Sequence, residues 1–416
     1  MNSLARRNFS QRISRGTVAA LAVIIFLALT AARPALAQSE SIMYSFCALA
    51  NCDDGMIPQG GLIMDSNGNL YGVAFNGGDY IPGGVVFKLS PEGEETILHN
   101  FGAIPNDGNQ PQGALIMDKQ NNLYGTTCTG GANDIGDGGG NGTVFKLSPD
   151  GTETILYNFG ADNNDGSVPR AGVVMDSKGN LYGTTNEGGA YGAGIVFRVS
   201  PEGRETILHT FGSTGATDGV GPWAGLVMDA NENLYGTTYQ GGLADAGTAF
   251  EISAKGEYSI LYSFGATSTD GALVDTSLTL DSQGNLYGTT YNGGTNNVGT
   301  VFKLTPTSSG AWRETILYNF SDHDNNCYFP ASGVLLGANG DIYGTTLEGG
   351  IGSAFPAGCA YVLSAAGKLT NLHSFDGFPD GANPAGNLLR DSQGNLYGET
   401  SSGGNVDYGI AFRITP

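Results

Sequence analysis

Acidic residues followed by glycine recur along the chain, each four residues before a proline or its equivalent. Carboxylate oxygens are preferred ligands of hard cations, so a ring of them would attract calcium; no other cofactor is indicated. An Asp-Gly pair is more simply a turn, in which the Asp oxygen accepts backbone N–H bonds. The weak candidates for a metal site are Asp54, Asp107, Asp165, Asp218, Asp270 and Asp380.

Histidine gives little support for catalysis. His323 stands between Asp322 and Asp324 and could hold a metal, although a solvated loop is the favoured interpretation. His99, His209 and His373 occupy a strand position that holds tyrosine elsewhere in the chain, so they are interpreted as structural. Clusters of Cys and His at the short spacing of a zinc site are absent from the sequence. We therefore assign no catalytic residue and expect a non-enzymatic protein.

One recurring position changes its residue type while its neighbours keep theirs. It directly follows the proline position and should lie at the start of an innermost strand. Trp beside Arg, Asp and amide groups suits contact with a sugar or a peptide, with neutral drift as the equal alternative. The candidate ligand-binding residues are Gln59, Gln112, Arg170, Trp223 and Asp275, and the remaining copies carry Ala331 and Ala385.

Five cysteines allow at most two disulfides within the chain. Pairing of Cys327 with Cys359 would fix the insert at residues 351–358, and we favour it. Cys47 and Cys52 could close a second, small loop, which would leave Cys128 free. Spacing alone permits fifteen such pairings, so these alternatives stay open.

A repeat of about fifty residues positions all these groups. Its signature is Asn-Leu-Tyr-Gly, with seven tyrosines at spacings of 52 to 58 residues; only the sixth copy departs, reading Asp-Ile-Tyr-Gly. Self-similarity at such a period is typical of propellers and solenoids. The anchors are Tyr71, Tyr124, Tyr182, Tyr235, Tyr287, Tyr343 and Tyr397.

Each copy contains four short segments rich in β-branched and aromatic residues, bounded by Gly, Asn, Asp or Pro. The segments do not alternate cleanly between apolar and polar residues, which indicates strands covered on both faces. Asp65 to Asn69 predicts a tight hairpin, with Asp65 capping the turn and Gly68 adopting positive φ. We predict an all-β protein with four strands in each repeat.

The ends of the chain predict how the repeats are arranged. The last copy stops after its third strand, and an extra fourth-strand segment, residues 41–46, precedes the first copy. Pairing of this N-terminal strand with the last three strands would close a ring without free edges. We predict a seven-bladed β-propeller in a single domain, residues 38–416. A β-solenoid is the rival, but it would need capping ends.

The repeat resembles the Gloeo/Verruco tandem repeat of bacterial secreted and surface proteins. Residues 284–290 (Gly-Asn-Leu-Tyr-Gly-Thr-Thr), the Gly pair 293–294 and residues 299–304 (Gly-Thr-Val-Phe-Lys-Leu) carry the resemblance. Asp-Ser-x-Gly-Asn-Leu-Tyr is also similar to the NHL type of propeller repeat. The resemblance implies a propeller outside the cytoplasm, and it implies no activity and no catalytic residues.

The N-terminus resembles a secretory signal peptide over residues 1–37, with arginines, an apolar run and a small-residue cleavage site. The chain carries a net charge of −21; residues 1–37 hold five of the 18 basic residues and none of the 39 acidic ones, so 13 basic residues and a charge of −26 remain after cleavage. Such a charge disfavours nucleic acids and anionic membranes. We expect a secreted or periplasmic monomer without membrane insertion.

The expected function is a secreted binding or scaffolding propeller. A protein or carbohydrate at the cell exterior would contact its channel-mouth face, where propellers usually meet ligands, although fold alone does not prove a site. The alternatives are a metal-assisted hydrolase or lyase and a purely structural envelope protein.

Overall fold

The computed structural model describes residues 39–104, 106–133, 140–323, 327–330, 332–350 and 357–415. The predicted signal peptide, Asp324, Ala331 and most of the predicted insert at residues 351–358 lie outside these ranges. Within them, the regular elements are β-strands and one short 3-10 turn, η1 (Ala50–Cys52).

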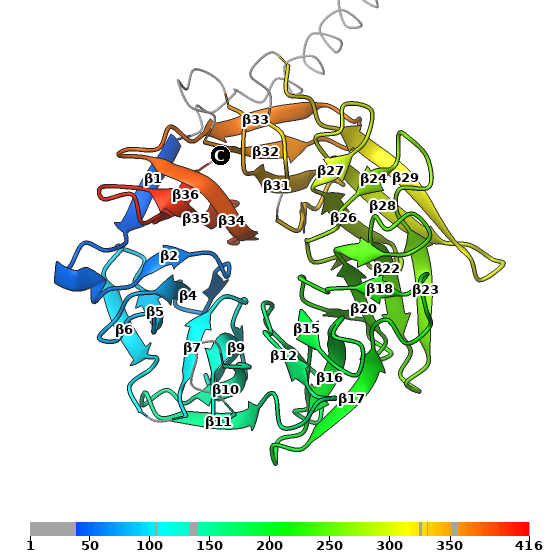
Figure 1. The fold of residues 1–416 in the computed structure, drawn as a ribbon. Helices are drawn as coiled ribbons and strands as arrows, with labels where there is room; N and C mark the ends of the chain where they lie inside the picture. The colour runs from blue at the N-terminus through cyan, green and yellow to red at the C-terminus, as the bar shows by residue number, and fades with distance from the viewer. Residues whose placement is uncertain are drawn as a thin grey trace, which may run out of the picture. The chain divides into compact units, whose positions relative to one another are not determined.

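Residues 40–415 form seven antiparallel blades around a central channel, each with its first strand nearest the channel and its fourth outermost (Figure 1). In the first five blades the innermost strand is split into two short segments. Blade 1 holds β2 (Met56–Pro58), β3 (Ile63–Met64), β4 (Leu70–Asn76), β5 (Val85–Leu89) and β6 (Glu95–Asn100). Blade 2 holds β7 (Gly108–Pro111), β8 (Ile116–Met117), β9 (Leu123–Gly130), β10 (Thr143–Leu147) and β11 (Glu153–Asn158).

The next three blades also carry a short two-stranded extension. Blade 3 holds β12 (Gly166–Ser167), β13 (Val174–Met175), β14 (Leu181–Thr185), β15 (Glu187–Gly188), β16 (Ile195–Val199) and β17 (Glu205–Thr210). Blade 4 holds β18 (Gly219–Val220), β19 (Val227–Met228), β20 (Leu234–Thr238), β21 (Gln240–Gly241), β22 (Thr248–Ile252) and β23 (Tyr258–Ser263). Blade 5 holds β24 (Gly271–Ala272), β25 (Thr279–Leu280), β26 (Leu286–Thr290), β27 (Asn292–Gly293), β28 (Thr300–Pro306) and β29 (Trp312–Asn319).

The last two blades complete the ring. Blade 6 holds β30 (Leu335–Leu336), β31 (Ile342–Thr346), β32 (Cys359–Leu363) and β33 (Leu369–Ser374). Blade 7 holds β34 (Gly381–Arg390), β35 (Leu396–Gly403), β36 (Ile410–Thr415) and, from the other end of the chain, β1 (Ser39–Ser45). The strand order β1-β36-β35-β34 confirms the predicted closure by the N-terminal strand.

The hairpin between the first two strands of each blade explains the repeat signature. Asp65 Oδ1 accepts the backbone N–H groups of Asn67 and Asn69 at 2.8 and 2.9 Å. Its Oδ2 accepts the Asn69 amide at 2.7 Å and the Tyr71 hydroxyl at 3.1 Å. One carboxylate thus fixes the Asn and Tyr of the motif, as predicted for a capping Asp. Copy six has Gly337 in place of this Asp, and there the Asn is also absent.

The core consists of aromatic pairs that connect each blade to the next. The Phe that follows the fourth strand of one blade packs against the third-strand aromatic of its neighbour, with ring centroids 4.9 to 5.4 Å apart in all seven pairs. At Gly72, a Cβ atom would lie 2.5 Å from the Phe87 ring, so the glycine of the motif makes room for the aromatic. The pairs are Phe46–Phe87, Phe101–Phe145, Phe159–Phe197, Phe211–Phe250, Phe264–Phe302, Phe320–Tyr361 and Phe375–Phe412.

Candidate functional site

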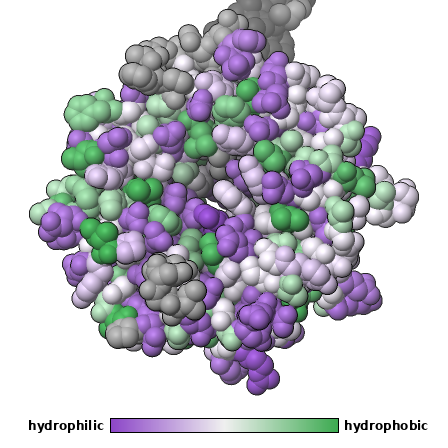
Figure 2. All heavy atoms as spheres, in the orientation of Figure 1, coloured by the Kyte–Doolittle hydropathy of each residue, from purple (hydrophilic) through white to green (hydrophobic). Residues whose placement is uncertain are grey.

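The five predicted ligand-binding residues lie together at the channel. Each follows the first segment of an innermost strand, so the ring of blades carries all five to one place. They line a single cavity of about 500 Å³, a volume suited to a small ligand. Figure 2 shows the channel opening near the centre of one face, with hydrophilic and hydrophobic residues around it. The residues are Gln59, Gln112, Arg170, Trp223 and Asp275, and Ala385 joins them from blade 7.

Trp223 is the centre of an array that joins two blades. Its indole stacks on Tyr239 with ring centroids 5.1 Å apart, and 41% of its surface is exposed. The Arg170 guanidinium of the preceding blade lies 4.9 Å from the indole centroid, which is the distance of a cation–π contact. The Arg170 Nε group is buried without a hydrogen-bond partner. The array therefore places apolar surface beside a guanidinium group.

Asp275 supplies the acidic group of the cavity. Its Oδ1 atom is buried and accepts no hydrogen bond, and burial raises the carboxyl pKa to about 7. Arg170 and Asp275 both lie in the described part of the chain, and they are not ion-paired with each other. Asp275 is therefore able to accept or to donate a hydrogen bond near neutral pH.

A second variable position at the mouth was not found from the sequence. It follows the Thr-Thr pair of the second strand, or Glu-Thr in blade 7, and holds Tyr239, Leu347 and Ser401 in different copies. Leu347 and Ser401 line the cavity, and Tyr239 supports Trp223. Cys128 occupies the same position in blade 2 and donates a weak hydrogen bond to Gln112 at 3.3 Å. Alignment of the seven copies, and comparison of the residues at this position, would have identified it from the sequence.

Cys128 is the free cysteine of the described residues, as predicted. Burial raises the pKa of its thiol to about 12, although Arg170 opposes this shift. A thiol with such a pKa is a poor nucleophile at neutral pH. Cys128 is therefore a packing residue beneath the cavity.

The six Asp-Gly carboxylates lie away from the cavity, at separate junctions between the blades. Asp165 is representative: it accepts the N–H of Ala161 at 2.8 Å and that of Gly166 at 2.7 Å. Such bonds are those of the turn that the sequence favours. None of Asp54, Asp107, Asp165, Asp218, Asp270 and Asp380 lines the cavity, so the six do not converge on one cation at the channel.

Each junction also contains a fourth-strand residue and a residue that begins the fourth strand of the next blade. At the junction of blades 2 and 3, the Tyr157 hydroxyl lies 3.0 Å from both Asp165 and Glu205. Burial, together with the negative charge of Asp165, raises the Glu205 pKa to about 7. Sequence reasoning missed these glutamates, although the recurring Glu-Thr-Ile-Leu segment was a visible signal. They are Glu95, Glu153, Glu205 and Glu314, with Glu40 at the junction of blades 6 and 7.

His323 lies at the surface, with Nδ1 3.6 Å from Asp322. The metal candidates that the structure does bring together, within the described residues, are two other groups: His99 with Asp107 and Glu153, and Glu40 with His373 and Asp380. His99 and His373 are strand residues as predicted, but each also faces two carboxylates.

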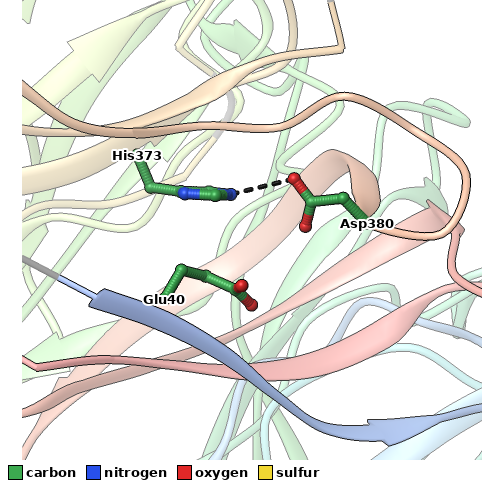
Figure 3. Close-up of side chains that lie close together, drawn as sticks. All are labelled: Glu40, His373 and Asp380. Atoms are coloured by element: carbon green, nitrogen blue, oxygen red, sulfur yellow. Dashed lines mark hydrogen bonds and ion pairs between the residues drawn. The ribbon is translucent and has the colours of Figure 1, made fainter.

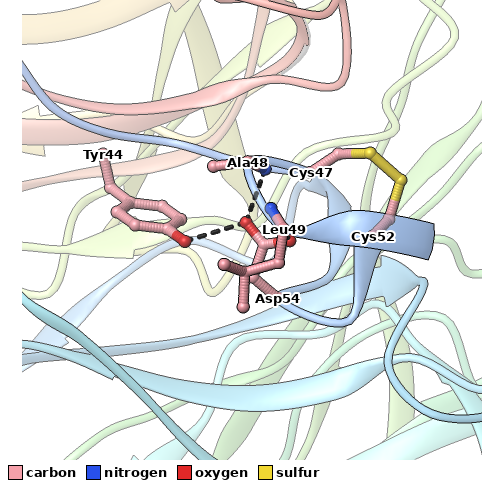
Figure 4. Close-up of a disulfide and its surroundings, with 6 residues drawn as sticks. All are labelled: Tyr44, Cys47, Ala48, Leu49, Cys52 and Asp54. Carbon is pink, nitrogen blue, oxygen red and sulfur yellow. Dashed lines mark hydrogen bonds between the residues drawn. A yellow bond between two sulfur atoms is a disulfide. The ribbon is translucent and has the colours of Figure 1, made fainter.

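The favoured disulfide, Cys327–Cys359, is confirmed, and the second candidate pair, Cys47–Cys52, is also bonded. The Cys47–Cys52 bond closes the loop around Asp54, which accepts the N–H groups of Ala48 and Leu49 and the Tyr44 hydroxyl (Figure 4). The Cys327–Cys359 bond joins the connection into blade 6 to the first residue of β32. Disulfides persist in oxidising compartments, so they indicate a location outside the cytoplasm.

Fold and site together define a closed seven-bladed β-propeller with a ligand-sized cavity in its channel. The chain belongs to the Gloeobacter/Verrucomicrobia repeat family, whose model matches residues 35–139 and 136–355. This membership confirms the resemblance noted from the repeat. No helix among the described residues has the length and hydrophobicity to span a membrane.

Comparison with known proteins adds the fold alone. No curated protein sequence matches the chain. A virginiamycin B lyase from Staphylococcus aureus is similar in structure, with a TM-score of 0.58 at 12% identity, covering 91% of this chain and 99% of that one. A mutant puromycin hydrolase is similar with a TM-score of 0.51 at 12% identity, covering 83% and 50% of the two chains.

Proposed function

We propose that the chain is an exported binding propeller that holds a glycan at its channel mouth. The observation that carries the proposal is that five residues breaking the repeat, one from each of five successive blades, line one cavity. The neighbouring positions keep their residue types because the fold of each blade requires them. The ring thus presents five side chains of four types to one volume.

The chemistry of the cavity favours a neutral ligand rich in hydroxyl groups. Gln59 and Gln112 offer both donors and acceptors, while Arg170 and Asp275 add a guanidinium and a carboxyl group to the cavity lining. Trp223 offers apolar surface to the C–H groups of a sugar ring. The strong negative charge of the chain disfavours anionic ligands.

The surface around the mouth supports a ligand larger than one sugar. Connections after the second and fourth strands of each blade share one face, by the antiparallel order of the strands. Most of the exposed large apolar side chains of the described residues stand in these connections, where they offer apolar contacts to a larger ligand. They include Leu49, Tyr80, Ile81, Ile104, Tyr191, Leu243, Phe378, Val406 and Tyr408.

Export is the second part of the proposal. The signal-like residues 1–37 and the two disulfides support passage to the periplasm or the medium.

Trp223→Ala is expected to weaken glycan binding at least tenfold, because central aromatic contacts contribute on the order of 1–2 kcal/mol or more. A glycan array would identify the ligand, and calorimetry would give its affinity for each variant. Ile207→Ala is the control, since Ile207 is exposed on the outermost strand β17 and lies neither in the cavity nor in the surrounding connections. Unchanged affinity of Trp223→Ala would refute the assignment of the mouth.

A second candidate function is acid–base catalysis in the same cavity. Asp275 favours it, because a carboxyl with a pKa of about 7 can exchange a proton near neutral pH. Incubation of the bound glycan with the protein, followed by mass spectrometry, separates the two functions. Cleavage that Asp275→Asn abolishes would support catalysis, and recovery of intact glycan would support binding alone.

A further inference from the structure

The junction between blades 1 and 2 differs from the tyrosine junctions. His99 of β6 stands where Tyr157 and Tyr262 stand elsewhere, and its Nε2 atom faces two carboxylates. The distances are 3.9 Å to Asp107 Oδ1 and 3.6 Å to Glu153 Oε2. A tyrosine hydroxyl reaches its two carboxylates at 3.0 to 3.1 Å. The polar atoms of the histidine junction therefore lie farther apart than those of the tyrosine junctions.

Polar atoms in this junction are buried but lack hydrogen-bond partners. In four other junctions the Asp Oδ1 accepts the N–H of the following glycine, at 2.7 to 2.9 Å. Asp107 Oδ1 accepts no such bond, and His99 Nε2 also lacks a hydrogen-bond partner, whereas the unpartnered Oε1 of Glu153 is shared by the glutamates of the other junctions. The Asp107 and Glu153 side chains are 1% and 7% exposed. Buried polar atoms in native proteins normally have partners, and here Asp107 Oδ1 and His99 Nε2 face each other at a distance too long for a normal hydrogen bond.

We propose that His99, Asp107 and Glu153 bind a divalent transition metal ion of the zinc class, which joins blade 1 to blade 2. One imidazole nitrogen and two carboxylates form a ligand set that suits zinc. Ligand atoms around tetrahedral zinc lie about 3.2–3.6 Å apart, and the three ligand atoms here lie within 4.8 Å of one another, so small side-chain movements would bring them to the geometry of a zinc site. The other Asp107 oxygen accepts the Ala103 N–H at 3.0 Å, which orients Oδ1 toward the site.

Two other histidine junctions in the same chain serve as internal comparisons. At the junction of blades 3 and 4, Tyr258 replaces the glutamate, stacks on His209 at 3.6 Å and donates to Asp218 at 2.9 Å, which fills the space. At the junction of blades 6 and 7, Glu40 faces His373 and Asp380 (Figure 3). There His373 Nε2 already bonds Asp380 at 2.9 Å, and both Asp380 oxygens have partners.

His99→Tyr tests the proposal, because it restores the residue that other junctions hold and so preserves the fold. The mature protein would be stripped with a chelator and titrated with zinc alone by calorimetry, with metal content measured after dialysis. The intact protein is expected to bind zinc with micromolar or tighter affinity and to gain several degrees in Tm. His99→Tyr is expected to lose one zinc ion per chain and the associated Tm gain.

The control is His209→Tyr, which is expected to keep the full zinc content. Glu153→Gln removes a proposed ligand, so it is expected to weaken zinc binding at least tenfold without greatly changing the Tm of the metal-free protein. Cobalt substitution adds a spectroscopic readout, since a tetrahedral site gives visible absorption that His99→Tyr should remove. Zinc binding that survives in His99→Tyr at full stoichiometry, or no binding at millimolar zinc, would overturn the proposal.

Discussion

A chain that lacks β1 and Phe46 is expected to be unfolded or insoluble. In the intact protein β1 is the fourth strand of blade 7. Its removal therefore exposes the edge of β36 and opens the ring. It also removes Phe46, which is fully buried against Phe87, and the Tyr44 hydroxyl bond to Asp54. Loss of a buried Phe alone costs about 3–5 kcal/mol, against a total stability of about 5–15 kcal/mol.

The matched point variants on this segment are Phe46→Ala and Ile42→Ala. Ile42 lies on β1 but is 41% exposed, so its truncation is expected to cost well under half as much as that of Phe46. Urea unfolding followed by tryptophan fluorescence measures both. Equal stability of Phe46→Ala and the intact chain would contradict closure by this segment.

Stability is expected to fall as pH rises from about 5 to about 9. At the tyrosine junctions, one hydroxyl proton faces two carboxylates, so the second carboxylate needs a proton of its own. Accordingly, burial and the neighbouring Asp raise the pKa of Glu205 to about 7 and that of Glu314 to about 8. These pKa values exceed those of the unfolded chain, so this stabilisation is complete below about pH 4.5 and is lost as pH rises through 7–8.

The double variant Glu205→Gln and Glu314→Gln is expected to reduce this loss, because the amide replaces the protonated carboxyl. Each group is expected to contribute on the order of 1 kcal/mol at pH 9 after allowance for partial solvent exposure, which is a Tm difference of a few degrees. Glu92→Gln with Glu257→Gln removes the same charge from exposed turns and should leave the pH profile unchanged. Identical pH profiles for the two double variants would contradict the account.

Much of the fold could be predicted because the number and spacing of the repeats determine how many blades form and how the ring closes. The Tyr anchors gave the blade count, and the unmatched segment before the first copy gave the closure. The Asp65 turn was predictable because its hydrogen-bond partners stand within six residues of it. Bonds of such short range can be inferred from local sequence alone.

The site was predictable only in part, because its contacts cross between blades. The departure of Trp223 and Arg170 from the repeat marked both residues, but their contact spans 53 positions along the chain. The open junction at His99 depends on Glu153, which belongs to the next blade. The sequence pattern of one copy therefore favoured a simple strand role for His99.

The central claim is that the channel mouth binds a ligand through the residues that break the repeat. Alanine stands at this position in blade 7 as Ala385, so the blades tolerate it. The decisive measurement is glycan-array binding by a variant with alanine at residues 59, 112, 170, 223 and 275, beside the intact mature protein. We predict that the variant keeps the Tm within a few degrees and loses all glycan signals. A variant that is folded and binds the same glycans with the same affinity would contradict the claim.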